Sequence, residues 1–171
     1  NMFPELIDSR ATLISGYHRG PIPGIGNPAG AQAVMFLGMH AASGSDGFLA
    51  HTLTSRIARL EVNQRLLAEI EVFAASLAPW EIRPIFFSGC PVACKQAAAV
   101  VKNIQCFAIE KSRGSEGFDF GNWRSALAQA AVKSLSNHKT KPYEPVGPFD
   151  ARVTMRDGEA LAAKLASRWN F

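Results

Sequence analysis

The sequence predicts an α/β fold: a three-layer α/β/α arrangement with a mostly parallel sheet and an inserted β-hairpin. The first supporting observation is the unbroken apolar run at residues 33–38, which is typical of a strand buried on both faces. The second is that such runs alternate, along the middle of the chain, with segments whose apolar residues recur at helical spacing. A length of 171 residues with 47% apolar content suits one sizeable core. We therefore expect one domain over residues 1–171, with a core portion at 1–110 and a C-terminal portion of helix and strand at 111–171.

The individual elements follow from runs of β-branched and aromatic residues and from helical periodicity. Strands are expected at residues 12–15, 33–38, 49–54, 57–62, 83–88, 105–110 and 152–155. Helices are expected at residues 66–78, 92–101, 122–135 and 158–168. The alternation favours helices on both sides of the sheet, and the inserted hairpin is expected to carry His51.

Two histidines and one glutamate form the candidate site. His40 directly follows the apolar run at 33–38, and functional side chains often lie just past the carboxyl ends of such strands. His51 comes shortly after it, and Glu69 lies in an otherwise apolar helical segment. Imidazole nitrogens and carboxylate oxygens are zinc ligands, so these residue types point to metal chemistry.

Helical periodicity distinguishes Glu69 from Glu71. One helical face is formed by the large apolar residues Leu66, Ile70, Phe73 and Leu77. At about 100° per residue, Glu69 falls beside this face and Glu71 falls well away from it, so Glu71 is expected to face solvent. A carboxylate on the buried side needs a partner. For Glu69 that partner is either a metal ion or an arginine such as Arg65 or Arg59.

These residues belong to a set of segments that resembles a known family. The segments are, in order, residues 13–16 (LISG), 36–41 (FLGMHA), 49–53 (LAHTL), 62–69 (VNQRLLAE) and 84–89 (PIFFSG). In order and in spacing they resemble the zinc-dependent D-aminopeptidases. The resemblance extends from Asn1 to about Ile109 and is weak beyond. It implies that His40 and Glu69 bind zinc and that His51 is the catalytic histidine.

The resemblance also implies a two-zinc site that this sequence does not complete. In the family, an Asp-x-Glu strand and an Asn-Asp-Ser-His segment supply the remaining ligands. The Asp-x-Glu at Asp157–Glu159 instead has the pattern of a helix N-terminus with an acidic first turn. We therefore expect the missing ligands on an additional N-terminal segment or on a partner chain, and we expect a C-terminal segment beyond Phe171, so that this chain is part of a longer metallopeptidase unit.

The function that the resemblance implies is hydrolysis of the amide bond of a short peptide, D-amino-acid-containing peptides included, through a metal-activated water. A homo-oligomeric ring is the implied assembly. The alternative is a non-catalytic subunit or scaffold of an oligomeric assembly, in which His40 and Glu69 form at most a weak metal site. The segment at 114–121 reads as a loop, and because the resemblance fails there, substrate choice is expected to differ.

A thiol enzyme is a third possibility, because Cys90 lies where a strand turns into a helix. The spacing of Cys90, Cys94 and Cys106 matches no paired zinc motif, and their odd number does not suggest a disulfide framework. A packing role is therefore favoured for the cysteines. Cys90 is expected to lie beside the substrate pocket.

Composition argues against other classes of protein. The net charge is +4, but basic residues are spread along the chain, with only a loose cluster at Lys133, His138, Lys139 and Lys141. No nucleic-acid motif is present. No apolar stretch approaches the roughly 18 residues that span a membrane. We therefore expect a cytoplasmic protein without a nucleic-acid or membrane partner.

Overall fold

A computed structural model of the chain describes residues 4–14, 16, 20–22, 24–28, 30–110 and 117–167. The chain divides into two compact units, Asn1–Gly30 and Ala31–Phe171. In the first unit the described residues include the short 3₁₀ helix η1 (Pro4–Leu6). The strand predicted at 12–15 is wrong for residues 12–14, which have no regular structure, and Ser15 lies outside the described residues.

The second unit is built on a parallel sheet. Its strands are β1 (Ala33–Met39), β4 (Arg83–Gly89) and β5 (Gln105–Ala108), in the order β1-β4-β5. The central strand β4 is buried from its second residue to its last, as its apolar sequence predicts. Phe86 and Phe87 point to opposite faces of the sheet and are both fully buried, so each face has its own apolar layer.

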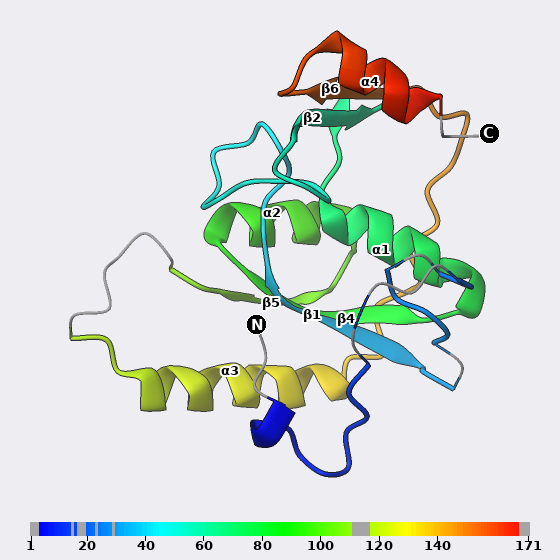
Figure 1. The fold of residues 1–171 in the computed structure, drawn as a ribbon. Helices are drawn as coiled ribbons and strands as arrows, with labels where there is room; N and C mark the ends of the chain where they lie inside the picture. The colour runs from blue at the N-terminus through cyan, green and yellow to red at the C-terminus, as the bar shows by residue number, and fades with distance from the viewer. Residues whose placement is uncertain are drawn as a thin grey trace. The chain divides into compact units, whose positions relative to one another are not determined.

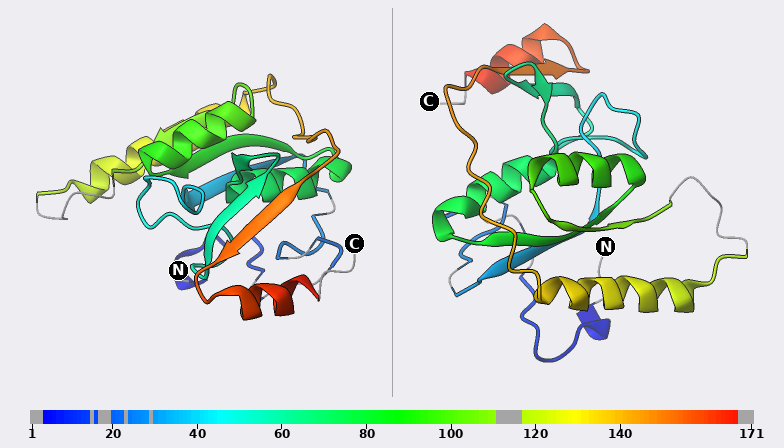
Figure 2. Two further views of the ribbon diagram at one scale, coloured as in Figure 1. Left: turned by 90° about the horizontal axis from the view of Figure 1, so that it is seen from above. Right: turned by 180° about the vertical axis from the view of Figure 1, so that it is seen from behind.

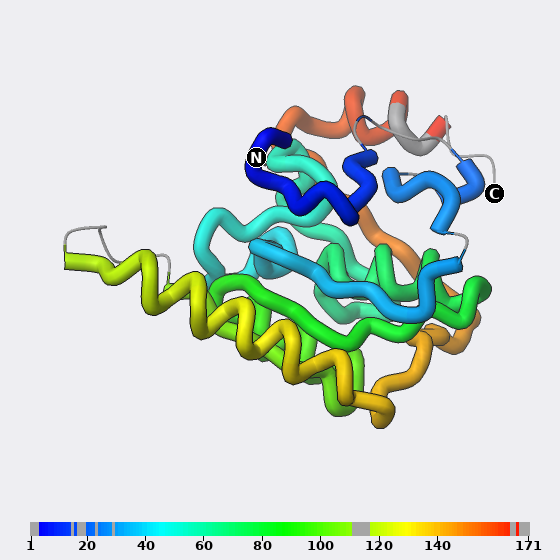
Figure 3. The backbone as a smooth tube through the Cα atoms, turned by 90° about the horizontal axis from the view of Figure 1, so that it is seen from below, coloured from blue at the N-terminus to red at the C-terminus, as the bar shows by residue number. Residues whose placement is uncertain are grey.

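Helices cover both faces of this sheet. Helices α1 (Glu69–Leu77) and α2 (Pro91–Val100) lie on one face, and α3 (Phe120–Leu135) lies on the other (Figures 1 and 2). Seen from below, α3 runs along β4 on the side away from α1 and α2 (Figure 3). The predicted α/β/α layering is therefore confirmed. Helix α3 begins at Phe120, earlier than predicted, because Asp119 caps it by accepting a hydrogen bond from Asn122 N (2.9 Å). Residues 114–116 of the predicted loop lie outside the described residues.

A small antiparallel sheet lies beside this core, in the order β3-β2-β6. It consists of β2 (Ile57–Val62), β3 (Arg65–Leu66) and β6 (Ala151–Met155), and α4 (Glu159–Ala166) packs on β6 (Figure 1). The hairpin therefore joins β2 to β3, through Asn63 and Gln64, whose positive φ angles of 51° and 65° suit a tight two-residue turn.

The predicted strand at 49–54 is wrong, and so is the expectation that the hairpin carries His51. Leu49 and Leu53 have φ angles of 48° and 63°, which lie outside the extended region that residues other than glycine adopt in strands, and the pairing in this stretch is an isolated bridge between Thr52 and Thr54. His51 lies instead in the loop of residues 40–56 between β1 and β2.

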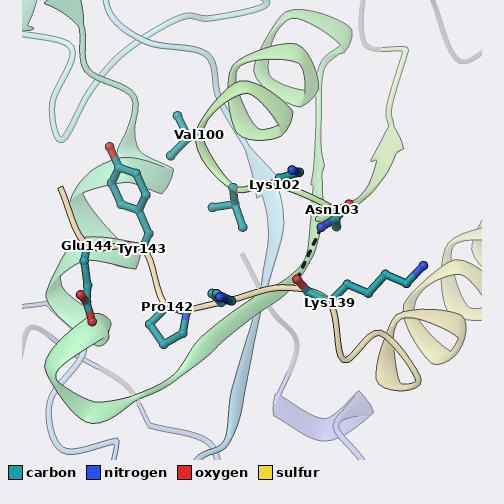
Figure 4. Close-up of a pocket in the computed structure, with 9 residues that line it drawn as sticks. Val100, Lys102, Asn103, Lys139, Pro142, Tyr143 and Glu144 are labelled. Carbon is teal, nitrogen blue, oxygen red and sulfur yellow. Dashed lines mark hydrogen bonds between the residues drawn. The ribbon is translucent and has the colours of Figure 1, made fainter. Parts of the chain in front are cut away.

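The extended segment after α3 returns across the end of α2 before it reaches β6. Asn103, in the turn between α2 and β5, is linked to it from both sides: Asn137 Nδ2 donates to Asn103 O (2.7 Å), and Asn103 Nδ2 donates to Lys139 O (3.5 Å; Figure 4). Beside these bonds is a pocket of about 480 Å³, whose lining includes Lys102, Lys139 and Lys141. Two lysines of the loose basic cluster thus line a pocket on a different part of the fold from His51.

The interpretation of Glu71 as solvent-facing is wrong. Helix α1 begins at Glu69 rather than at Leu66, so Glu71 occupies the third helical position and its Oε2 accepts a hydrogen bond from Ala68 N (3.0 Å). Glu71 is 2% exposed and forms an ion pair with Arg65. The sequence did contain a signal for this role, because Glu71 follows the N-cap Ala68 by three residues, the spacing of a capping box. The apolar stripe directed attention to Glu69 instead.

Tyr143, from the returning segment, is a third member of this polar cluster around the buried Glu71. Its hydroxyl donates to Glu71 Oε1 (3.4 Å). Burial and the negative charge of Glu71 raise the pKa of Tyr143, so the phenol stays protonated and remains a donor. The three polar side chains line an otherwise largely apolar groove of about 700 Å³, together with residues that include Val72 and Phe149.

Replacing Glu71 with glutamine tests this correction. Glu71→Gln removes the charge that Arg65 and Tyr143 face, and we expect the free energy of unfolding to fall by about 1–3 kcal/mol, measured by urea denaturation. The matched control is Glu81→Gln, because Glu81 is exposed just beyond the same helix. Equal midpoints for the two variants would contradict the buried role of Glu71.

Candidate functional site

His40 stands where the sequence predicts it, at the carboxyl end of β1, which ends at Met39. The loop of residues 40–56 then folds back on itself, so that His51 N donates to Ala41 O (3.0 Å). Gly47 makes this close return possible, since a Cβ atom there would lie 2.4 Å from the Cβ of Ala41. The loop geometry therefore brings the two histidines together.

The two imidazole rings are in contact, and the Nδ1 atom of each lies within hydrogen-bond distance of a main-chain carbonyl oxygen. Their centroids are 4.7 Å apart and their planes are inclined by 42°. His40 Nδ1 lies 2.9 Å from Phe48 O, and His51 Nδ1 lies 2.8 Å from Leu49 O. Because a carbonyl oxygen only accepts, each neutral ring carries its proton on Nδ1 and donates it. Each Nε2 then has its lone pair available for a proton or a metal ion.

Reciprocal hydrogen bonds between Ser43 and Thr52 hold the two arms of the loop together. Ser43 N donates to Thr52 Oγ1 (3.0 Å), and Thr52 N donates to Ser43 Oγ (2.7 Å). Thr52 Oγ1 also donates to Leu67 O (2.9 Å), which connects the loop to the residues before α1. Both side chains are fully buried, so these bonds are shielded from water. Sequence reasoning missed this pair, because a lone serine and threonine in a loop carry no distinctive pattern.

Glu69 lies close to the His51 arm of the loop. As the first residue of α1 it accepts a hydrogen bond from Leu53 N on Oε1 (3.0 Å). The alternative of an ion pair with Arg65 or Arg59 is wrong, since Arg65 pairs with Glu71 and Arg59 with Glu61 (3.0 Å). On the other arm, Ala42 N donates to Gln96 Oε1 of α2 (2.9 Å), which ties the loop to the helical layer.

The histidines line an open pocket of about 900 Å³, which we call the histidine pocket. Its wall is otherwise formed by small and polar residues of the loop and by one arginine from the turn after β6: Gly44, Ser45, Gly47, Leu49, Ala50, Ser55 and Arg156. The pocket size suits a small molecule. Arg156 was not among the sequence-based candidates, because only the pairing of β2 with β6 brings it to the loop.

The donors present are of the types that zinc takes. A metal-bound histidine usually donates its second ring N–H to a carbonyl or carboxylate, as His40 and His51 do here, and ligating carboxylates are usually hydrogen-bonded as Glu69 is. Over the part of the chain that the structure describes, no group of three or more His, Cys, Asp or Glu side chains is placed to hold a metal ion. A zinc site with about four ligands thus needs donors beyond these.

Cys90 and the acidic pair at Asp157 and Glu159 have structural positions. Cys90 is 2% exposed at the N-terminus of α2, and its Sγ faces Gly47 from behind the loop rather than from the pocket wall. Asp157 Oδ2 accepts a hydrogen bond from Arg56 Nε (2.8 Å), and Glu159 is the first residue of α4. The described helices include none long and apolar enough to cross a membrane.

Substituting Thr52 tests whether the reciprocal bonds stabilise the loop. Thr52→Val keeps the side-chain shape but leaves Ser43 N and Leu67 O without their partner, so we expect a loss of about 1–3 kcal/mol in the free energy of unfolding, measured by chemical denaturation. Thr154→Val is the matched control, because Thr154 is exposed on β6 and should tolerate the change. A similar loss in both variants would argue against a special role for Thr52.

Comparisons with known proteins place the chain in a family. Among curated protein sequences none matches it. Among solved structures it is similar to the Zn-dependent D-aminopeptidase DppA from Bacillus subtilis, described as a self-compartmentalizing protease, with a TM-score of 0.72 and 21% sequence identity. The match covers 90% of this chain and 58% of that one, so the chain spans less than two thirds of its length. The family model Peptidase_M55, D-aminopeptidase, matches residues 1–170, and the chain therefore belongs to the D-aminopeptidase family.

Proposed function

We propose that the protein is a zinc-dependent aminopeptidase that hydrolyses the amide bond after the amino-terminal residue of short peptides, D-residues included. The observation that carries the proposal is the histidine pair, whose Nδ1 atoms are fixed by main-chain carbonyls at the carboxyl end of β1, in a chain of the D-aminopeptidase family. Two imidazole rings with fixed tautomers in one pocket can serve as a metal ligand and as a proton carrier.

His40 and Glu69 are the metal-binding residues in this proposal. His40 offers Nε2 from the end of a rigid strand, and Glu69 offers a carboxylate from the first turn of α1. When bound, zinc, of which the resemblance to the family implies two ions in the complete site, would lower the pKa of a water to about 7 and would polarise the substrate carbonyl. The remaining ligands come from outside the described residues.

His51 is the proposed catalytic residue. Its Nδ1 proton is held by Leu49 O, so its Nε2 is the atom that accepts a proton from the attacking water and returns it to the leaving amine. Such a positioned base contributes about 10²- to 10⁴-fold to a rate. Its ring lies in tilted contact with that of His40, with the ring centroids 4.7 Å apart, so the proposed base and the proposed ligand are neighbours.

The proposed assembly is a homo-oligomer. The similar structure is described as self-compartmentalizing, and this chain exposes Val146 at 86% and Phe149 at 56% beside the apolar groove that Tyr143 lines. Exposed apolar side chains around a groove are typical of surfaces that pair with another chain.

Zinc content and turnover separate the proposed roles. His40→Ala and Glu69→Gln each remove a ligand, so each should lower the zinc content of the complete protein, measured by atomic absorption, and should abolish amide hydrolysis. His51→Ala should retain zinc but lower the turnover number by about 10²- to 10⁴-fold.

His138→Ala and Glu81→Gln are the matched controls, since both residues are exposed and neither lines the histidine pocket. Unchanged zinc content in both ligand variants would refute the assignment, and loss of zinc from His51→Ala would make His51 a ligand. A complete protein that binds no zinc would favour the scaffold alternative. Activity that survives chelation but is lost on thiol alkylation would favour Cys90.

A further inference from the structure

Arg156 brings a fixed positive charge to the histidine pocket. It follows β6 directly, and its main-chain N donates to Arg56 O (2.9 Å) while its Nε donates to Ser55 O (2.9 Å). The two bonds fasten both the backbone and the stem of the guanidinium group to the end of the loop that carries His51. Because Nε is used in this way, the two terminal amino groups remain as a planar pair of donors.

The charge of Arg156 is not neutralised by a neighbouring acid. Other arginines of this region are paired, Arg56 with Asp157 (2.8 Å) and Arg59 with Glu61 (3.0 Å). Within the described ranges no carboxylate lies in ion-pair contact with Arg156, and among the side chains that line the histidine pocket it alone carries a permanent charge. An unpaired guanidinium fork beside a pocket is suited to a carboxylate, which it binds through two parallel hydrogen bonds.

We propose that Arg156 binds the C-terminal carboxylate of the substrate and so restricts the enzyme to short peptides with a free carboxyl end. This inference rests on the proposed function. A short peptide with apolar side chains has one permanent negative charge, at its C-terminus, and the pocket contains both the histidine pair and Arg156. In a longer peptide the C-terminal carboxylate lies farther along the chain from the amide bond beside the histidines, so it does not meet Arg156 while that bond is in place.

A pair of substrates that differ only in this charge tests the proposal. In the zinc-loaded complete protein, D-alanyl-glycine should have a lower KM than D-alanyl-glycinamide. Arg156→Gln should raise the KM for D-alanyl-glycine about 10- to 100-fold, the range for losing a charged hydrogen-bond pair, and change the KM for the amide less than about twofold. Arg156→Lys should restore part of the preference, since it keeps the charge without the fork.

Arg56→Gln is the matched control. Arg56 is adjacent, exposed and engaged with Asp157, so its loss should leave the ratio of the two KM values unchanged. If Arg156→Gln weakens the acid and the amide equally, Arg156 only supports the loop through Ser55, and the proposal is wrong.

Binding to the zinc-free protein keeps this test separate from catalysis. Calorimetric titration with D-alanyl-glycine and with its amide should show tighter binding of the acid, and the difference should disappear in Arg156→Gln. Equal binding of both compounds by the unsubstituted protein would overturn the role of Arg156. Failure of the zinc-loaded protein to hydrolyse either compound, with the binding difference intact, would refute the proposed function while leaving the carboxylate site in place.

Discussion

The reciprocal hydrogen bonds between Ser43 and Thr52 are the constraint on which the site depends. They join two arms of a loop that contains no regular structure, and the further bond from Thr52 Oγ1 to Leu67 O fixes that loop to the residues leading into α1. His40 and His51 lie on the two arms of this loop and Glu69 begins α1, so these bonds connect the two arms with the residues that lead to Glu69. Loops are ordinarily the least ordered parts of a fold, so a fully buried polar clamp is what lets one carry precisely placed side chains.

The sequence predicted those parts of the fold that depend on local pattern. Strand β4 was found because a strand buried on both faces must be continuously apolar, and the helices on either side followed from their periodicity. The same pattern located β1, but the expectation that β1 is buried on both faces is wrong, since Phe36 is its only buried residue and Leu37 is 63% exposed. The end of β1 then placed His40 without further information. The same local reasoning failed at residues 49–54, where Leu49 and Leu53 resemble strand residues in type but adopt positive φ angles and are exposed.

The misassignment of Glu71 has a different physical cause. Its apolar stripe was identified correctly, but burial of Glu71 depends on Tyr143, 72 residues away, and on the returning segment that covers this side of α1. Arg156 was missed for the same reason, since its approach to the histidine pocket results from the long-range pairing of β2 with β6. In both cases the surroundings of a charged side chain include a segment that is remote in the sequence, and periodicity within one element does not report such contacts.

The carbonyl groups that orient the histidines belong to the main chain of Phe48 and Leu49, not to their side chains. Those two side chains are exposed, at 41% and 69%, and Leu49 lines the pocket. Substitution of Leu49 therefore alters the shape and polarity of the pocket wall, while the carbonyl groups that fix the imidazole tautomers remain. The wall of the histidine pocket and the tautomers of its two imidazoles are thus set by different atoms of the same residue, the side chain and the main-chain carbonyl of Leu49.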